Sequence, residues 1–154
     1  MAIGADHRGT EAAVRLADRL RAEHYDVVLE LPAAGQACDY PDAAYSVGTA
    51  VAGGRADLGI LICGTGVGMS MAANKIKGVR AALVHDEITA ELSRSHTNAN
   101  IICLSADLLG IRLIEKIVDL WLKTAFEGGR HVRRIAKIEA IEQGRDPRGL
   151  SNGG

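Results

Sequence analysis

Short apolar runs alternate with amphipathic segments along the whole of this 154-residue chain. Runs of strand length recur five times, at residues 2–5, 26–31, 58–63, 79–85 and 101–104. Such runs are typical of strands that are buried on both faces of a parallel sheet. Between them, apolar residues recur at helical spacing, as in Ala13, Leu16, Ala17 and Leu20. The pattern therefore predicts strands and helices in alternation.

Five such strands with helices between them predict an α/β fold, a doubly wound, Rossmann-like three-layer sandwich with a five-stranded parallel sheet. Ligands of such sheets bind in the crevice outside the carboxyl ends of the strands. We therefore expect the candidate site residues to meet at that edge. They are Asp6, His7, Cys63, the glycine loop at 64–68 and Asn100.

The segment 107–126 has the widest apolar coverage of any predicted helix. A surface helix normally carries one apolar stripe, so the excess predicts an oligomer interface, most simply a two-fold dimer. Asp107 at its start is a predicted N-cap residue. The apolar positions that give this width are Leu113, Ile114, Ile117, Val118, Leu120 and Trp121.

A last helix is predicted at about 130–143, after two glycines, with Arg130 and Arg134 one turn apart on one side. The length of the chain suits one domain, which we place at 1–143. We expect 144–154 to be a disordered tail.

The stretch 57–75 carries the clearest chemical signal, because it predicts a strand, a glycine loop and a helix in direct succession. Glycines let a backbone approach a ligand closely, and the amides of a helix's first turn attract negative charge. The thiol of Cys63, at the end of the strand, would be biased toward thiolate beside those amides. The stretch therefore predicts an anion-binding loop with a reactive cysteine.

Two alternatives compete with this interpretation. Cys63 is equally compatible with an ordinary buried cysteine. The glycines could instead belong to a dinucleotide-binding fingerprint, for which Asp86 lies at about the expected spacing of 20 residues. Met69 stands where that fingerprint requires its third glycine, and the chain is short for two mononucleotide-binding halves.

Composition narrows the class of protein. With 47% hydrophobic and 24% charged residues the chain is globular, and a net charge of −1 argues against a general nucleic-acid or anionic-membrane binder. The longest run without charges, 58–74, is broken by glycines and is shorter than the roughly 20 apolar residues of a membrane span. Three cysteines, Cys38, Cys63 and Cys103, without C-x-x-C spacing or a signal peptide, lead us to expect a reducing cytoplasm.

Six short motifs occur in an order that resembles the type B ribose-5-phosphate isomerases and the related galactose-6-phosphate isomerase subunits. The resemblance covers nearly the whole chain. It implies the doubly wound sandwich, a homodimer or tetramer with active sites between subunits, a sugar-phosphate substrate, and no metal or cofactor. The motifs are Ile3 to His7, Asp39-Tyr40-Pro41, Ile60 to Gly68, Ala72 to Lys75, Leu92-Ser93-Arg94 with His96, and Glu127 to His131.

Interconversion of an aldose phosphate and a ketose phosphate needs a base, an oxyanion site and a phosphate site. The resemblance assigns the base to Cys63 and the acid/base of sugar-ring opening to His96, with Asp6 nearby. Thr65 would relay or hold a hydroxyl proton. The amides from Gly64 to Gly68, including those of Gly66 and Val67, would hold the enediolate oxygen.

The resemblance also implies the substrate contacts. His7, Arg130 and Arg134 would hold the phosphate, with the two arginines reaching across the subunit boundary. The remaining predicted contacts are Tyr40, Thr97 and Asn100.

Simpler roles remain open for several of these residues. His96 could cap helix carbonyls, Arg130 and Arg134 could form a solvated helix face, and Asp6 could only hold a turn.

Three positions depart from the pattern of the family. Met69 stands where one branch uses an acidic base, so this chain resembles the branch that uses cysteine. Thr97 stands where asparagine is common, and Asp107 stands where many members carry arginine, which leaves the preferred sugar open. The alternatives are an isomerase of another pentose or hexose phosphate, and a non-catalytic homologue that binds a sugar phosphate or a nucleotide.

Overall fold

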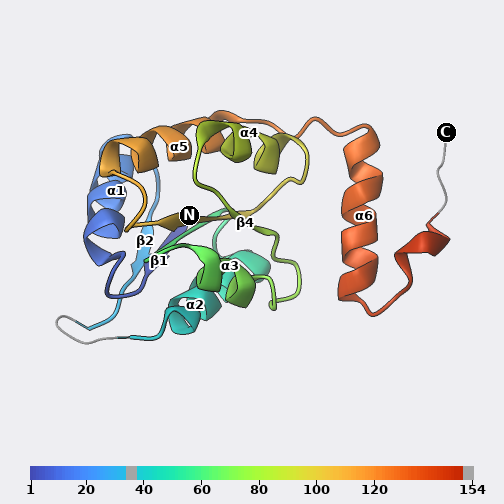
Figure 1. The fold of residues 1–154 in the computed structure, drawn as a ribbon, viewed down its shortest axis with the longest axis horizontal. Helices are drawn as coiled ribbons and strands as arrows, with labels where there is room; N and C mark the ends of the chain where they lie inside the picture. Colours follow the sequence, from blue (N-terminus) through green and yellow to red (C-terminus); the bar gives the residue numbers. More distant parts are fainter. Residues whose placement is uncertain (34–37, 151–154) are drawn as a thin grey trace.

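The computed structural model describes residues 1–33 and 38–150 of the chain. Within them, strands and helices alternate as the sequence predicts (Figure 1). They are β1 (Ala2–Ala5), α1 (Thr10–Ala22), β2 (Val28–Glu30), α2 (Tyr40–Ala52), β3 (Gly59–Cys63), α3 (Val67–Ala73), β4 (Ala81–Leu83), α4 (Glu87–Ser95), β5 (Ile101–Ser105), α5 (Ile111–Lys123) and α6 (Arg130–Glu142).

The five strands form one parallel sheet in the order β2-β1-β3-β5-β4. Helices α2 and α3 pack on one face, and α1, α4 and α5 pack on the other. The predicted doubly wound three-layer sandwich is therefore confirmed. Because the chain turns outward from β1 to β2 and then returns to β3 on the other side of β1, the carboxyl ends of β1 and β3 flank a topological switch point.

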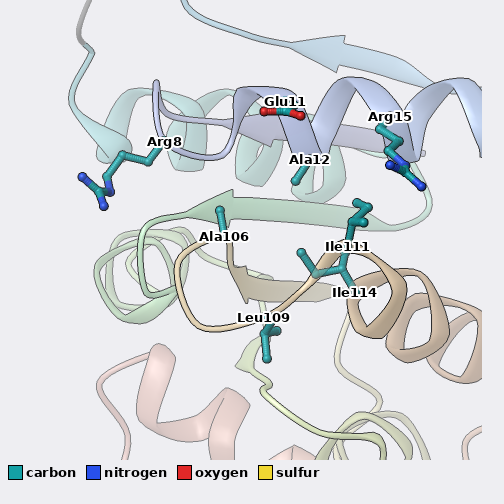
Figure 2. A pocket seen from close by; sticks show the side chains of 8 residues that line it. All are labelled: Arg8, Glu11, Ala12, Arg15, Ala106, Leu109, Ile111 and Ile114. Carbon is teal, nitrogen blue, oxygen red and sulfur yellow. The ribbon is translucent and has the colours of Figure 1, made fainter.

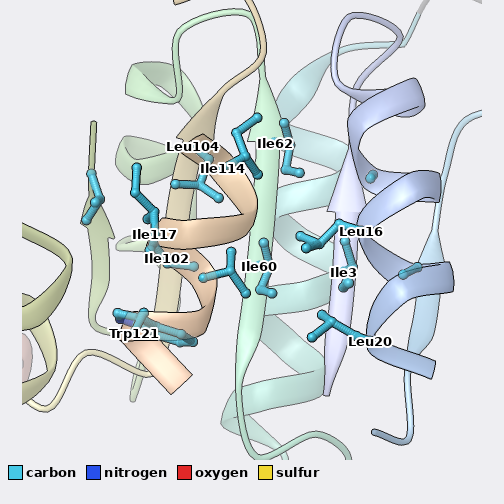
Figure 3. Close-up of a cluster of buried hydrophobic side chains, with 14 of the residues drawn as sticks. Ile3, Leu16, Leu20, Ile60, Ile62, Ile102, Leu104, Ile114, Ile117 and Trp121 are labelled. Carbon is cyan, nitrogen blue, oxygen red and sulfur yellow. The ribbon is translucent and has the colours of Figure 1, made fainter. Parts of the chain in front are cut away.

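The larger apolar cluster lies between the sheet and the helices α1 and α5 (Figure 3). Ile60, Ile62 and Leu104 of the sheet contribute to this cluster together with Leu16 of α1 and Trp121 of α5. Every residue of β1, β3 and β5 is buried, as expected for strands covered on both faces. This packing holds the carboxyl ends of the three central strands in a fixed arrangement.

The start of α5 corrects a prediction. The helix begins at Ile111 with Gly110 as its N-cap, so the prediction of Asp107 as the cap is wrong. The backbone amide of Asp107 donates to the carbonyl of Gly64 at 3.0 Å, which holds this segment against the end of β3. The turn between β5 and α5 is closed by Ser105, whose hydroxyl oxygen accepts a hydrogen bond from the amide of Leu108 at 2.9 Å.

Much of the apolar surface of α5 is buried within its own chain. Ile114, Ile117, Val118 and Trp121 are all buried within the chain. Helix α4 covers part of this surface, and the Trp121 indole Nε1 donates to the Ser93 hydroxyl of α4 at 3.1 Å. The packing of α5 on its own sheet and on α4 therefore accounts for most of its apolar width. Leu113 and Leu120 are only partly buried, and the oligomer interface at this helix stays a prediction.

Helix α6 stands apart from the sandwich at one end of the molecule (Figure 1). It buries only His131 and Ala140, and it leaves Val132, Ile138 and Ile141 exposed. The tail that we expected to be disordered contains a 3-10 turn, Pro147–Gly149, and residues 151–154 of that prediction lie outside the described residues. No helix in the described part of the chain is long and apolar enough to cross a membrane.

Candidate active site

Cys63 is the last residue of β3 and is 4% exposed. Its Sγ accepts a hydrogen bond from the backbone amide of Gly66 at 3.1 Å. The loop can turn back over the sulfur because Gly66 has a φ of 78°, in the left-handed region that favours glycine. A Cβ at Gly66 would also lie 2.7 Å from Leu83 Cδ1. Both the backbone conformation and the space therefore require a glycine beside this thiol.

The next glycine makes room for an aromatic ring. A Cβ at Gly68 would lie 2.5 Å from Cζ of Tyr40, so the tyrosine packs directly against the start of α3. Thr65, between Gly64 and Gly66, is exposed, and its carbonyl lies 2.9 Å from Nε2 of His85. Because α3 has only seven residues, the anion-binding capacity of this site depends on the loop amides more than on a long helix.

The loop after β1 adds Asp6 and His7 to the same edge of the sheet. Asp6 is 5% exposed, and its Oδ1 accepts hydrogen bonds from the amides of Arg8 and Gly9 at 2.9 and 3.0 Å. This carboxylate therefore shapes the turn into α1, as the simpler interpretation of Asp6 predicts. His7 is exposed, and its Nδ1 lies 3.3 Å from the carbonyl oxygen of Cys38. The first group of predicted site residues thus gathers around the carboxyl ends of β1 and β3.

The second group lies at the opposite edge. Helix α4 starts after the carboxyl end of β4 and runs back along the sheet for nine residues, about 13 Å, to His96 as its C-cap. The carbonyl of Asn100 accepts a hydrogen bond at 2.9 Å from the amide of Gly59, the first residue of β3. The expectation that Asn100 lies at the same edge as Cys63 is therefore wrong, because Asn100 precedes β5 instead of following it.

Two predicted substrate contacts in this second group use their side chains locally. Oδ1 of Asn100 accepts from the amide of Arg80 at 2.7 Å, and Nδ2 donates to the carbonyl of Gly78 at 2.8 Å. The hydroxyl of Thr97 donates to the carbonyl of Ser93 at 2.6 Å. Both side chains therefore hold the loop between α4 and β5.

His96 belongs to a cluster with Glu127 and His131. The imidazole rings of the two histidines stack with centroids 4.1 Å apart and planes inclined by 13°. Oε2 of Glu127 lies 3.8 Å from Nε2 of His96 and 3.6 Å from Nε2 of His131. The sequence analysis assigned no role to Glu127 or His131, although both belong to the last of the six motifs, Glu127 to His131.

The cluster offers ligand atoms within 4.8 Å of one another, so these three side chains could hold a metal ion. Burial, followed by the charges of His96, Arg130 and Arg134, lowers the pKa of His131 below its ordinary value. However, Nη1 of Arg134 lies 3.5 Å from Nδ1 of His131. Because Arg134 is a donor, it favours the tautomer in which Nδ1 of His131 accepts and Nε2 carries the proton. That proton points toward Glu127, so Nε2 has no lone pair to bind a metal ion in the cluster.

Arg130 and Arg134 are exposed at the start of α6, one turn apart. Neither forms an ion pair with a carboxylate among the described residues. Glu142, at the other end of α6, accepts a hydrogen bond at 2.7 Å from the amide of Gly78, just before β4. Helix α6 and its arginines therefore stand at the amino ends of the strands, away from the Cys63 edge.

The structure is thus an α/β protein with a buried thiol in a glycine loop at the switch point of its sheet and with exposed arginines on a separate helix. This chain belongs to the Ribose/Galactose Isomerase family, whose sequence model matches residues 1–138. The resemblance drawn from the motifs is therefore confirmed.

Individual relatives are similar over nearly their whole length. The ribose-5-phosphate isomerase B of Escherichia coli is 42% identical, over 95% of this chain and 98% of that protein. The D-erythrulose-4-phosphate isomerase of Pectobacterium atrosepticum is 37% identical, over 92% and 94%. A crystal structure of the Mycoplasma genitalium ribose-5-phosphate isomerase B with bound ribulose-5-phosphate is 48% identical, with a TM-score of 0.88 over 92% of this chain and 95% of that one.

Proposed function

We propose that this protein interconverts ribose 5-phosphate and ribulose 5-phosphate by proton transfer at Cys63. Membership of the isomerase family supports an aldose–ketose isomerase. The relative from Mycoplasma genitalium, whose structure holds ribulose-5-phosphate, supports the pentose as substrate. The observation that carries the proposal is the buried Sγ of Cys63, which accepts a hydrogen bond from the amide of Gly66 at the switch point of the sheet.

The proposed reaction needs one base that acts twice. The Cys63 thiolate removes the proton from C2 of the open-chain aldose, the electron pair forms a C1–C2 double bond, and O1 becomes an enediolate oxygen. Amides of the loop from Gly64 to Gly68 stabilise that charge. Cys63 then returns the proton to C1 while O2 becomes the carbonyl, and Thr65 relays the hydroxyl proton between O1 and O2.

Ring opening and phosphate binding depend mainly on the second group of residues, with His7 contributed by the first group. His96 acts as the acid/base on the cyclic sugar, and Arg130 and Arg134 together with His7 hold the phosphate. Asp6, at the end of β1, lies near the cyclic sugar and assists the proton transfers of ring opening.

The separation of the two groups within one chain supports a shared site. His96 and the arginines of α6 stand at the amino edge of the sheet, and Cys63 stands at the carboxyl edge. A second chain that brings its own amino-edge group to the first chain's Cys63 would complete the site. Exposed Val132, Ile138 and Ile141 on α6 give this helix apolar surface to pack on a partner. We therefore propose a homodimer, with a tetramer made of two such dimers as the alternative.

The direct test is isomerase activity with ribose 5-phosphate, followed by a panel of four-, five- and six-carbon aldose phosphates. Turnover of ribose 5-phosphate with the highest kcat/KM supports the proposal. Turnover confined to another sugar phosphate would support the alternative isomerase, for which the D-erythrulose-4-phosphate isomerase from Pectobacterium atrosepticum gives a reason to include four-carbon substrates. Binding without turnover of any sugar would indicate a non-catalytic homologue.

A further inference from the structure

Arg8 and Asp107 form an ion pair across the end of β3. Arg8 follows β1 and Asp107 follows β5, and these two strands flank β3 in the sheet. Arg8 Nε lies 3.3 and 3.0 Å from Oδ1 and Oδ2 of Asp107, and Nη2 lies 2.8 Å from Oδ2. This forked geometry fixes the orientation of the guanidinium as well as its position.

The ion pair lies directly against the residue that follows Cys63. A Cβ on Gly64 would lie 2.9 Å from Oδ2 of Asp107 and 3.0 Å from Nε of Arg8. The glycine therefore lets the pair approach the loop at the distance of direct packing. The guanidinium therefore lies against Gly64, the residue next to Cys63 in the chain.

Backbone hydrogen bonds anchor both partners to site residues. The amide of Arg8 donates to Oδ1 of Asp6 at 2.9 Å. The amide of Asp107 donates to the carbonyl of Gly64 at 3.0 Å. The pair is thus held more firmly than an ordinary surface ion pair between two long side chains, although the Arg8 side chain is 56% exposed.

The pair also leaves one donor for a ligand. Both carboxylate oxygens of Asp107 are engaged by Nε and Nη2, whereas Nη1 of Arg8 has no acceptor among the described residues. Figure 2 shows the Arg8 side chain extending away from Glu11 and Arg15, which line the same cavity. The pair therefore offers a ligand a donor at Nη1 of Arg8.

We propose that the Arg8–Asp107 pair is a specificity-determining wall of the substrate site, in which Arg8 donates from Nη1 to a hydroxyl of the sugar and Asp107 positions the guanidinium. This inference rests on the proposed isomerase function. The pair selects among sugar phosphates by chain length and hydroxyl pattern, because a donor fixed beside Gly64 suits only hydroxyls that reach it. Phosphate recognition stays with His7, Arg130 and Arg134.

The experiment compares Arg8→Gln, Arg8→Lys, Asp107→Asn and the double variant Arg8→Gln/Asp107→Asn with the wild type. The measurements are kcat/KM for four-, five- and six-carbon aldose phosphates, competitive inhibition by inorganic phosphate, and thermal melting. We expect kcat/KM for the preferred sugar to fall about tenfold relative to the others in each single variant, the fold-change of one lost hydrogen bond to a buried ligand. Arg8→Lys keeps the charge but loses the fork, so it should behave like Arg8→Gln.

The double variant should be no worse than either single variant, because the two residues act as one unit. Asp146→Asn is the matched control, since Arg148 binds Asp146 with the same forked geometry, at 3.0, 3.1 and 2.8 Å, in the C-terminal tail. This control should leave the ranking of sugars unchanged.

An unchanged ranking of sugars in the Arg8 and Asp107 variants overturns the inference, whether or not the melting temperature falls. A rise in the inhibition constant of phosphate that matches the loss of kcat/KM also overturns it, because the pair would then be a phosphate contact. A wild type that isomerises none of the sugars overturns the proposed function and this inference with it. An active wild type whose variants keep its ranking overturns the inference alone.

Discussion

The two edges of the sheet carry different kinds of functional group. At the carboxyl edge, Asp6 and Cys63 are buried and bound by backbone amides of their own loops. At the amino edge, Arg130 and Arg134 are exposed on a helix that leaves the sandwich. The proposed reaction centre is therefore fixed by its own chain, whereas the proposed phosphate-binding arginines are exposed on a helix that buries few residues.

The proposed roles of the two edges explain why the residues at one edge are buried and those at the other are exposed. A base must be fixed in advance at the reacting carbon, because reorganisation during the reaction would raise the barrier. Arginines that hold a phosphate can be ordered by the partner chain and the ligand together. The comparison therefore predicts that a change of Cys63 affects turnover, whereas changes of Arg130 and Arg134 affect binding and depend on the second chain.

Replacement of Cys63 by alanine should give the largest effect. We expect Cys63→Ala to lower kcat by about 10³-fold or more, with substrate binding largely kept, because the thiolate acts on the carbon-bound proton and not on the phosphate. The matched control is Cys103→Ala on the neighbouring strand β5. Cys103 is fully buried, and burial raises the pKa of its thiol, so it stays protonated and only fills the core.

The control should lose about 1 kcal/mol of unfolding free energy and keep its turnover. Steady-state kinetics, binding titration and denaturant unfolding measure the three quantities. Turnover by Cys63→Ala, or loss of binding together with activity, would count against Cys63 as the base.

Mixing two inactive chains tests the dependence on a second chain. One chain carries Cys63→Ala and the other carries Arg130→Ala with Arg134→Ala. If each site combines the two edges of different chains, half of the dimers are mixed and one site in each is intact, so about a quarter of wild-type activity should return. If each site is built from one chain, activity stays at zero after subunit exchange has been verified with differently tagged chains.

Sequence reasoning was most successful where a local pattern determines the structure. The apolar run before Cys63 and the glycines after it predicted the strand and the loop, because strand burial and left-handed backbone are local requirements. The edge at which Asn100 lies could also have been inferred, since a residue that immediately precedes a parallel strand must stand at its amino end. That prediction failed because Asn100 was grouped with the polar residues that follow strands.

Features that depend on neighbours could not be inferred from one sequence. Wide apolar coverage showed that α5 is buried, but only the packing of α4 shows that its own chain covers it. The ion pair of Arg8 and Asp107 joins residues 99 positions apart, and it forms because β1 and β5 flank β3. Strand order is not encoded in hydrophobic periodicity, so this wall of the site was not predictable.

A change at His96 should separate ring opening from proton transfer. We expect His96→Asn to lower kcat/KM for ribose 5-phosphate about 10²-fold, the usual contribution of a general acid/base. The defect should shrink with erythrose 4-phosphate, which cannot close a five-membered ring because its O4 carries the phosphate. Comparison of kcat/KM for both substrates provides the test, and an equal defect with both would assign His96 a binding or structural role instead.

The smallest expected effect concerns the pH dependence of stability at the amino edge. Burial, and then the nearby charges of His96, Arg130 and Arg134, lower the pKa of His131 in the folded chain. The unfolded chain therefore takes up this proton at a higher pH than the folded chain, and the free energy of unfolding falls as the pH drops below about 6.5. Below the folded-state pKa both states are protonated, and this contribution stops changing.

Replacement of His131 by asparagine removes the titrating group, so the variant should lose stability less steeply than the wild type as the pH falls from 7 to 5. His24→Asn, at an exposed histidine in the turn after α1, is the control and should keep the wild-type slope. Denaturant unfolding at several pH values, at one protein concentration because subunit association would shift the midpoint, measures the slopes. If the free energy of unfolding of the wild type and of His131→Asn fell in parallel with pH, folding would not lower the pKa of His131. The neutral His131 inferred for the cluster with His96 and Glu127 would then be wrong.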